Sequence, residues 1–338
     1  MKITMAHGSG GKATSELIEN IFAKAFDNPV IQAMEDSAVV DGFGKIAITT
    51  DSFVVTPVEY PGGDIGRLSI CGTVNDLLMR GALPRYITCG FILQEGVESE
   101  QLERVVASMA ATAREAGVTI VAGDTKVVEG NGGIFINTTG VGSVPDGVQI
   151  SSSNAQDQDV VLVSGNLGDH HATILRSRME IENSIQSDNA PLKDIVMNLM
   201  DAGIEVHVLR DVTRGGLATV LKELAEASEC TIELEESAIP VDPQVRDFCG
   251  LLGLDPLYMG NEGKLVAIVA RKDAKDACEI IRSSRYGEHA AIIGNVIRPA
   301  ITDRTEAEPN KGRLLLKTRI GGTRILDVLY GEGLPRIC

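Results

Sequence analysis

The sequence lacks an excess of basic residues. Its 31 lysines and arginines face 47 aspartates and glutamates, which gives a formal net charge of −16. This charge disfavours nucleic acid and anionic membrane surfaces as general partners, because both carry many negative charges. A bound anion is still compatible with it, since glycine-rich turns, single lysines or metal ions reverse the field locally.

Long apolar runs are missing as well. No stretch approaches the roughly 20 apolar residues that cross a bilayer, and the first residues, MKITMAHGSGG, contain no apolar signal core. The six cysteines form no CxxC pair and no dense framework, which disfavours a disulfide scaffold. We therefore expect a cytoplasmic protein with reduced thiols.

The cysteines differ in their surroundings. Cys71, Cys89 and Cys278 lie in apolar segments, which are typical of small core residues. Cys338 ends the sequence in GEGLPRIC, where there is little for a side chain to pack against.

Residues 329–338 are predicted to form a mobile tail. Gly331 and Gly333 loosen the backbone, and Pro335 prevents a helix at the residue before it. A thiol on such a tail can reach more than one place.

Turning to what is present, 338 residues with 43% apolar composition are enough for roughly two domains with sizeable cores. Apolar periodicity alternates between strand-like and helix-like throughout, which predicts an α/β fold. The polar, turn-rich segment 144–159 predicts a boundary between an N-terminal domain, 1–150, and a C-terminal domain, 151–328. Helices are expected at 15–26, 64–80, 99–116, 190–202, 215–227 and 273–284, and strands at 45–55, 86–95, 118–124, 134–142, 160–165, 264–270, 290–297 and 313–320.

The segment HGSGGKA, residues 7–13, is rich in glycine but matches no phosphate motif fully. Ala6 stands where a P-loop has its first glycine, and Ala13 replaces the serine or threonine that follows the lysine. Two interpretations stay open: a flexible turn, or a mobile flap that closes over a phosphate. The flap residues would be Gly10, Gly11 and Lys12.

Aspartates recur in the first half at predicted strand ends, in turns and in an apolar helix. A lone aspartate of this kind usually forms a cap or a turn, in roughly four cases of five. Several that converge would repel one another unless cations lay between them. Oxygen-only ligands select Mg²⁺, which typically takes one or two carboxylates beside phosphate oxygens and water. The candidates are Asp36 in EDSAVV, Asp51 in TTDSFVV, Asp76 in NDLLMRGA and Asp124 in AGDTK, with Asp51 and Asp124 expected at strand ends.

Two stretches of the second half also carry acidic residues. In RDVTRGGLA, Asp211 precedes a glycine pair that opens a helix, so the stretch is either an anion site or an N-cap and turn. Glu262 lies in the tight turn GNEGK, and composition alone predicts that it is exposed there. The adjacent His170 and His171 would point apart on a helix, which favours a helix opening over a metal site.

The motifs occur in one order that covers nearly the whole chain: EDSAVV, TTDSFVV, NDLLMRGA, AGDTKV, VVLVSGNLGDH, RDVTRGGLA and GNEGK. This series resembles the PurM-like ATP-binding superfamily of aminoimidazole ribonucleotide synthetase, selenophosphate synthetase and thiamine-monophosphate kinase. The glycine-rich start and the final PRIC narrow the resemblance to the HypE family of hydrogenase maturation factors. Each motif alone is weak, whereas the ordered set together with this C-terminus is specific.

The resemblance implies a two-domain α/β fold that dimerises through its first domain, with ATP near the dimer interface. It implies that Asp36, Asp51, Asp76 and Asp124 surround Mg²⁺. The flap resembles the glycine loop of selenophosphate synthetase, with one departure: Ser9 stands where that enzyme has a catalytic cysteine or selenocysteine. The reactive thiol is therefore expected at Cys338 instead.

The family's reaction gives that thiol a purpose. In the HypE family the terminal thiolate receives a carbamoyl group from a carbamoyltransferase, HypF, and ATP then dehydrates the S-carboxamide to an S-cyanide. The cyanide passes to iron on a HypC–HypD complex and becomes a ligand of the [NiFe] hydrogenase centre. A mobile tail would let one sulfur visit all three places.

The chemistry assigns the remaining roles. A carboxamide oxygen is a poor leaving group, so it must be phosphorylated, and the amide nitrogen must lose its protons to a base. We assign the base to Glu262, and we assign phosphate stabilisation or proton transfer to Lys126, for which a surface salt bridge is the alternative. Two other functions stay open: a small-molecule synthetase or kinase of the same superfamily, and a non-catalytic carrier of the thiol adduct.

Overall fold

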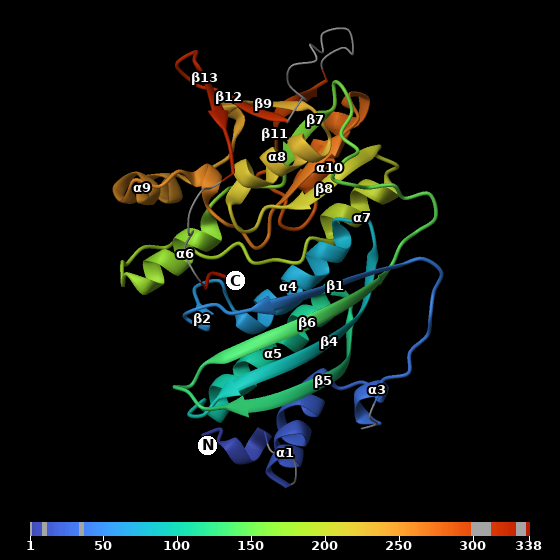
Figure 1. Ribbon diagram of the computed structural model, residues 1–338, viewed down its shortest axis with the longest axis vertical. Helices are drawn as coiled ribbons and strands as arrows, with labels where there is room; N and C mark the ends of the chain where they lie inside the picture. Colours follow the sequence, from blue (N-terminus) through green and yellow to red (C-terminus); the bar gives the residue numbers. More distant parts are fainter. Residues whose placement is uncertain (1, 9–11, 34–36, 299–311, 329–335) are drawn as a thin grey trace. The chain divides into compact units, whose positions relative to one another are not determined.

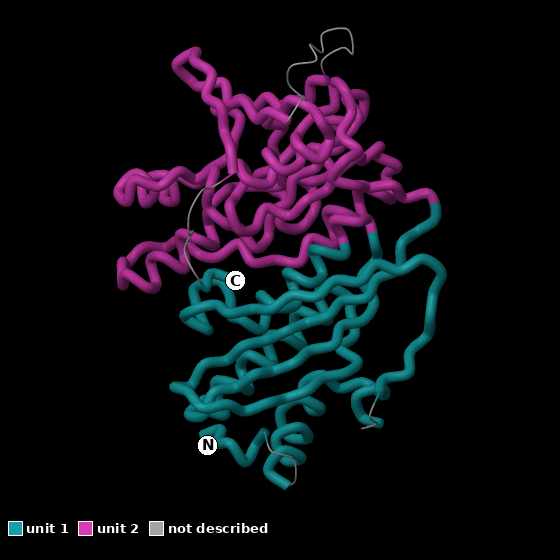
Figure 2. The backbone as a smooth tube through the Cα atoms, viewed as in Figure 1, with its two compact units in different colours: residues 1–77, 82–146, 336–338 teal, residues 78–81, 147–335 magenta. Residues whose placement is uncertain are grey.

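The computed structural model describes residues 2–8, 12–33, 37–298, 312–328 and 336–338. It divides into two compact units (Figure 2): the first comprises Met1–Leu77, Ala82–Asp146 and Arg336–Cys338, and the second comprises Leu78–Gly81 and Gly147–Pro335. The end of the sequence therefore belongs to the first unit, although the chain reaches it from the second. Among the described residues, no helix has the length and apolar character to cross a membrane.

A four-stranded sheet forms the centre of the first unit (Figure 1). Its order is β1-β6-β4-β5, and only the pair of β4 and β5 is parallel. The strands are β1 (Ile46–Phe53), β4 (Leu83–Gln94), β5 (Thr119–Val128) and β6 (Ile134–Ser143), and β2 (Glu59–Tyr60) and β3 (Gly63–Asp64) form a separate two-stranded ribbon.

Helices cover one face of this sheet. The helix α4 (Ile65–Leu78) is buried nearly all round, and its Gly72 lies so close to β1 that a Cβ there would stand 2.8 Å from the ring of Phe53. The helix α5 (Ser99–Ala116) matches the predicted span, and it ends because Gly117 takes a φ of 66°, which favours glycine. Short N-terminal elements complete the layer: η1 (Met5–Gly8), α1 (Lys12–Leu17), the π-helical η2 (Ile18–Ala23), α2 (Lys24–Phe26) and α3 (Pro29–Gln32).

No described element of the first unit covers the opposite face, called the open face below. Side chains alternate along β1, so that Phe53 faces the helices while Ile46 and Ile48 are exposed. Ile92 of β4 and Val128 of β5 are exposed on the same side. A largely antiparallel sheet can have one face in solvent. A face that exposes isoleucine and valine side chains from three strands is, however, typical of an interaction surface.

The second unit contains a seven-stranded sheet of order β13-β12-β9-β11-β7-β10-β8. All neighbours pair antiparallel except β12 and β9. Every residue of β7 and β10 is buried, because helices pack on both faces at the sheet centre. The strands are β7 (Val160–Val163), β8 (Val206–Asp211), β9 (Thr231–Glu235), β10 (Leu265–Val269), β11 (Ala291–Ile297), β12 (Arg313–Lys317) and β13 (Thr323–Leu326).

The core of this unit lies between α8 (Gly216–Ala227) and the sheet, where Leu217, Leu221 and Leu224 belong to one buried apolar cluster with Val161 and Val266. The helix α10 (Ala274–Ser283) contacts β7 and β11 and packs against α7 (Lys193–Asp201). The remaining elements are α6 (Asp169–Arg178), η3 (Glu236–Ala238), α9 (Pro243–Leu252), η4 (Pro256–Tyr258) and η5 (Arg271–Asp273). The predicted α/β class and the positions of α7, α8 and α10 are thereby confirmed.

Candidate functional site

Cys338 is docked on the first unit through backbone hydrogen bonds. The amide of Val54 donates to the carbonyl oxygen of Cys338 at 3.2 Å, and the amide of Thr56 donates to that of Arg336 at 3.1 Å. Between them, the side chain of Ile337 is only 4% exposed. The end of the sequence thus pairs like a short strand with residues 54–56, with Ile337 as its apolar anchor. Gly331, Gly333 and Pro335 lie outside the described residues.

Cys338 is also the accessible thiol of the chain. All six cysteines are described, and none of them forms a disulfide. Cys338 is partly exposed, whereas the other five are buried. Burial raises the pKa of Cys89 to about 12 and that of Cys230 and Cys249 to about 11, which keeps these thiols protonated. The expected core role of Cys71, Cys89 and Cys278 agrees with their burial.

Two of the predicted carboxylates lie on the helix-covered side of β1. The hydroxyl of Thr49 donates to Oδ2 of Asp76 on α4 at 2.7 Å. Asp51 is two residues further along β1 and therefore faces the same side, where both aspartates are half-buried. The side-chain amide of Asn137 donates to the carbonyl oxygen of Asp51 at 2.8 Å and fixes the strand there. Two carboxylates and a hydroxyl form an oxygen-only donor set, which fits Mg²⁺.

Asp124 and Lys126 form a second pair, on β5. The lysine Nζ lies 2.7 Å from both carboxylate oxygens of Asp124, and this hydrogen bond lowers the pKa of the aspartate. Because the side chains of a strand alternate, both residues project from the open face, while Thr125 between them is buried on the helix side. Lys126 is therefore ion-paired, as the alternative interpretation of the sequence allowed, but it is also largely exposed.

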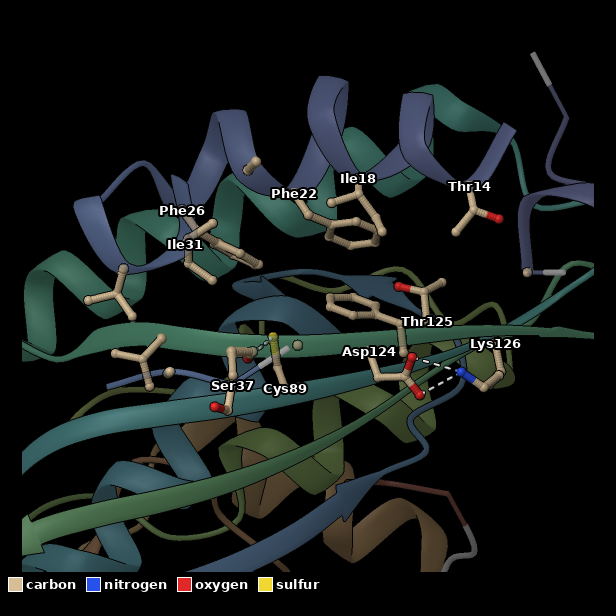
Figure 3. Close-up of a pocket in the computed structure, with 18 residues that line it drawn as sticks. Thr14, Ile18, Phe22, Phe26, Ile31, Ser37, Cys89, Asp124, Thr125 and Lys126 are labelled. Carbon is tan, nitrogen blue, oxygen red and sulfur yellow. Dashed lines mark hydrogen bonds and ion pairs between the residues drawn. The ribbon is translucent and has the colours of Figure 1, made fainter. Parts of the chain in front are cut away.

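A cavity of about 430 Å³ lies between the N-terminal helices and β5 (Figure 3). In this view Ile18, Phe22 and Phe26 point from the helices toward the strand, and Thr125 points back at them. Asp124 and Lys126 form its rim on the other side of the strand. A cavity of this size with apolar walls and a few polar groups at one end is typical of a small-molecule site.

The chain does not bring the predicted carboxylates together on one side of its own sheet. Asp51 and Asp124 were expected at strand ends, but β1 continues to Phe53 and β5 to Val128, so both lie within paired strands. They occupy the two outer strands and opposite faces. Among the described residues, no group of three or more His, Cys, Asp or Glu side chains is arranged to hold a metal ion. Asp36, Gly10 and Gly11 lie outside the described residues, and Lys12 is exposed at the start of α1.

Glu262 is buried rather than exposed, contrary to the expectation from composition. It is 4% exposed, and its turn is enclosed by residues 188–190 and by Asn261. The fully buried Asn261 side chain accepts from the amide of Gly168 at 2.7 Å and donates to the carbonyl oxygen of Val212 at 2.9 Å. Composition could not indicate this, because the segments that bury the turn are distant in sequence.

Buried charges surround this turn. Lys264 Nζ lies 3.4 Å from Oδ2 of Asp188, whose side chain is 2% exposed. Asp169 opens α6 nearby, and burial, followed by the charge of Asp188, raises the pKa of its carboxyl to about 7. A carboxyl with such a pKa exchanges protons at neutral pH, which is a property of many functional sites.

The other predicted residues of the second unit have structural partners. Asp211 is the last residue of β8, where it pairs with Leu265, and the N-cap of α8 is Gly215, so Asp211 is not that cap. His170 and His171 lie at the start of α6, as predicted. Nδ1 of His170 lies 2.8 Å from the hydroxyl of Ser187, and burial lowers the pKa of His171 to about 4.

Sequence reasoning missed several residues of these clusters. Asp188 gave no signal, because it lies in an irregular segment without a recognisable motif. Lys264 and Asp169 lie within the motifs GNEGK and LGDH, but the sequence drew attention to the neighbouring Glu262 and His170 instead. A lysine directly after an acidic turn and before a wholly apolar strand was the available signal.

Models of two families match the chain. The AIR synthase related protein N-terminal domain matches residues 34–144, and the AIR synthase related protein C-terminal domain matches residues 156–303. The thiamine-monophosphate kinase of Stenotrophomonas maltophilia K279a has the same fold at 20% identity, with a TM-score of 0.67 over 90% of this chain and 95% of that one. These findings confirm the predicted PurM-like fold.

Full-length relatives are more similar. The carbamoyl dehydratase HypE of Rhodobacter capsulatus is 44% identical over 100% of this chain and 98% of its own, and that of Escherichia coli K12 is 45% identical over 99% of both. A crystal structure of the hydrogenase maturation protein HypE in complex with ATP superimposes with a TM-score of 0.93 at 46% identity, covering 99% of both chains. A structure of a HypE–HypF complex gives 0.79 at 46% identity, covering 93% of this chain and 99% of that one.

Proposed function

The chain belongs to the HypE family of carbamoyl dehydratases, and on this premise we propose that it dehydrates a carboxamide carried on the sulfur of its own Cys338. In the reaction, R–S–C(O)NH₂ and ATP give R–S–C≡N, ADP and phosphate. The observation that carries the proposal is that Cys338 is docked and partly exposed, whereas the other five cysteines are buried.

The order of bond changes follows from the leaving group. The carboxamide oxygen takes the γ-phosphoryl group of ATP and then leaves as phosphate while the carbon–nitrogen triple bond forms. The nitrogen loses two protons overall, so a base must act, and we assign this role to Glu262. Its burial supports the assignment, because a carboxylate shielded from water is a stronger base toward a nearby N–H.

Nucleotide binding is assigned to the first unit. The apolar walls of the cavity along β5 suit the planar base of ATP, and Lys126 at its rim suits a phosphate. Asp51 and Asp76 would hold Mg²⁺, which supplies charge neutralisation on the phosphates. Asp36, Gly10, Gly11, Lys12 and Asp211 stay predictions of the resemblance. The ATP seen in the related crystal structure supports the nucleotide, and the metal rests on the donor chemistry alone.

We also propose that two copies pair through the open face. Exposed Ile46, Ile48, Ile92 and Val128 come from three of the four strands of the sheet, and a second copy would cover them. In such a dimer Asp124 and Lys126, which project from the open face, would face the partner copy.

The partners follow from the reaction. A carbamoyltransferase of the HypF kind must supply the carboxamide, and the HypE–HypF crystal structure of a relative supports this. An iron scaffold such as a HypC–HypD complex would take the cyanide. Six cysteines outside any disulfide agree with a reducing, cytoplasmic setting.

Intact mass tests the whole proposal. The protein is incubated with carbamoyl phosphate, ATP and a HypF-type carbamoyltransferase, and then given fresh Mg²⁺–ATP. We expect a carbamoyl increment that subsequently loses the mass of one water. A stable carbamoyl adduct would indicate a carrier, and ATP turnover without any adduct would indicate a small-molecule synthetase or kinase.

Exchanging either Asp51 or Asp124 for asparagine is expected to lower the ATP-dependent dehydration rate by about 100-fold or more, because charge-neutralising groups at phosphates act on the transition state. Each side chain is proposed to serve the nucleotide rather than the core, so the thermal melt should stay near that of the wild type. Asp146→Asn, which changes an exposed aspartate at the end of the first unit, is the matched control. Wild-type turnover in both variants would place the nucleotide site elsewhere.

Ile48→Arg is expected to convert the dimer to a monomer, because Ile48 is 63% exposed at the centre of β1 on the open face. The arginine would bury an unpaired charge in the proposed interface. Size-exclusion chromatography with light scattering gives the mass, and Ile325→Arg on β13 is a control at an isoleucine that is 75% exposed. If the variant keeps the wild-type mass, or the wild type is itself a monomer, the proposed interface is wrong.

A further inference from the structure

Three backbone polar atoms of Glu262 and Gly263 are held by hydrogen bonds. Asp188 Oδ1 accepts from the amide of Glu262 at 3.1 Å, and the amide of Ala190 donates to the carbonyl oxygen of Glu262 at 3.3 Å. The carbonyl oxygen of Gly263 accepts from Lys264 Nζ, also at 3.3 Å. The main chain that carries the proposed base is therefore clamped by one acidic and one basic side chain from outside the regular elements.

The turn is packed closely against the segment that contains Asp188. A Cβ at Gly263 would stand 1.9 Å from the carbonyl oxygen of Asp188, so only glycine allows the two segments to touch. A Cβ at Gly165 would stand 3.0 Å from Cε of Lys264, so the lysine side chain is confined as well. The clamp is thus a close-packed arrangement of two distant segments.

Burying the Asp188–Lys264 ion pair costs electrostatic free energy. Asp188 and Lys264 are 2% and 10% exposed at the side chain, and removing two charges from water offsets much of their attraction at 3.4 Å. Asp188 Oδ2 has no hydrogen-bond donor among the described residues. A buried pair with an unsatisfied oxygen contributes little to stability, and apolar residues would serve the core at least as well. Its position at the peptide of Glu262 suggests another reason for it.

We propose that the Asp188–Lys264 pair is a positioning device that fixes the carboxylate of Glu262 for proton abstraction. The inference rests on the proposed function, in which Glu262 is the base. A base must stand within hydrogen-bond reach of the proton it takes, and a displacement of about 1 Å lowers a rate by about 100-fold. Asp188 and Lys264 touch no reacting atom in this scheme, and they act only through the main chain of residue 262.

The test measures a single turnover of the carbamoylated chain after Mg²⁺–ATP is added, followed by intact mass. Lys264→Met is expected to lower the rate constant at saturating ATP by at least about tenfold, with the ATP concentration for half-maximal rate unchanged. Met fills a similar volume but cannot bond to the carbonyl oxygen of Gly263. Glu115→Gln, which breaks the ion pair with Arg67 in the first unit, is the control and should leave the rate unchanged.

A double-mutant cycle with Glu262→Gln separates positioning from general damage. If Lys264 acts through Glu262, adding Lys264→Met to Glu262→Gln should change the remaining rate by less than about twofold, because the base is already lost. Additive effects, each about as large as in the single variants, would show that the lysine works by another route and would overturn the proposal.

Folding damage is controlled by removing both charges. Asp188→Asn and Lys264→Met alone each strand one buried charge, so both should lower the melting temperature, and the double variant should recover most of that loss. The double variant should nevertheless stay slow. Recovery of both stability and rate would mean that the pair is only structural. If instead Glu262→Gln alone keeps the wild-type rate, the base assignment itself is wrong, and the positioning role is excluded with it.

Discussion

Cys338→Ala is expected to abolish carbamoylation by a HypF-type carbamoyltransferase completely, while ATP affinity stays within about twofold of the wild type. The loss is complete because a methyl group cannot bear the adduct, and because no other thiol of the chain is equivalent. Five cysteines are buried, and burial raises the pKa of four of them, Cys89, Cys230, Cys249 and Cys278. ATP affinity should survive because the proposed nucleotide residues lie on β1, α4 and β5.

Intact mass measures the loss of carbamoylation, and calorimetry measures the ATP affinity. Cys278→Ala provides the matched control, because it deletes one buried thiol from α10 and should leave the carbamoyl increment at one per chain. A carbamoyl group that appears in the Cys338→Ala protein, and that peptide mapping locates on another cysteine, would contradict the assignment. So would a variant that no longer binds ATP, since the thiol would then belong to the nucleotide site.

Ile337→Asp is expected to separate the two steps of the reaction. Carbamoylation should proceed at a rate near that of the wild type, whereas conversion to the cyano adduct should fall by about 100-fold. Ile337 is 4% exposed in the first unit, and a buried, unpaired carboxylate there would be too costly to keep. The backbone bonds from Val54 and Thr56 to the tail would be lost together with this anchor. The thiol adduct would then visit the ATP-binding unit without being held there.

Ile320→Asp is the control, because it makes the same exchange at a fully exposed isoleucine between β12 and β13. Both steps should be unaffected in that variant, and both variants should melt near the wild-type temperature, since only the last residues lose contacts. Equal conversion rates in Ile337→Asp and the wild type would mean that the docked position has no part in dehydration. A loss of carbamoylation as well would mean that the donor recognises the docked tail.

Local signals were sufficient for much of the fold. The helix at residues 99–116 could be predicted to the residue, because its apolar stripe runs without a break into Gly117, where the left-handed backbone favours glycine. The helix at 215–227 was placed within one residue for a similar reason, since it starts at a glycine pair. Pairing directions could not be predicted, because an apolar run such as 160–163 reads alike in parallel and antiparallel sheets.

The candidate site was harder to predict, because its geometry depends on contacts between distant segments. The aspartates at 51 and 124 follow apolar residues, and nothing local reveals that pairing to neighbouring strands continues beyond them. The burial of Glu262 depends on Asp188 and Ala190, more than 70 residues away in sequence. A glycine-rich tail predicts a flexible backbone, yet the tail around Ile337 pairs with residues 54–56, nearly 300 residues earlier in the sequence. No local stretch of sequence contains both segments, so this pairing could not be predicted.

Five of the six cysteine thiols are buried, and only that of Cys338 is partly exposed. This difference determines which thiol would be oxidised first under oxidative stress. Sulfenic acid forms first on thiols that water and peroxide can reach, and protonated thiols within a core are poor nucleophiles. Peroxide would therefore oxidise the sulfur of Cys338 long before it oxidised the buried cysteines in the cores of the two units. The molecule would lose its chemistry while remaining folded, and a cellular thiol reductant could restore it without any refolding.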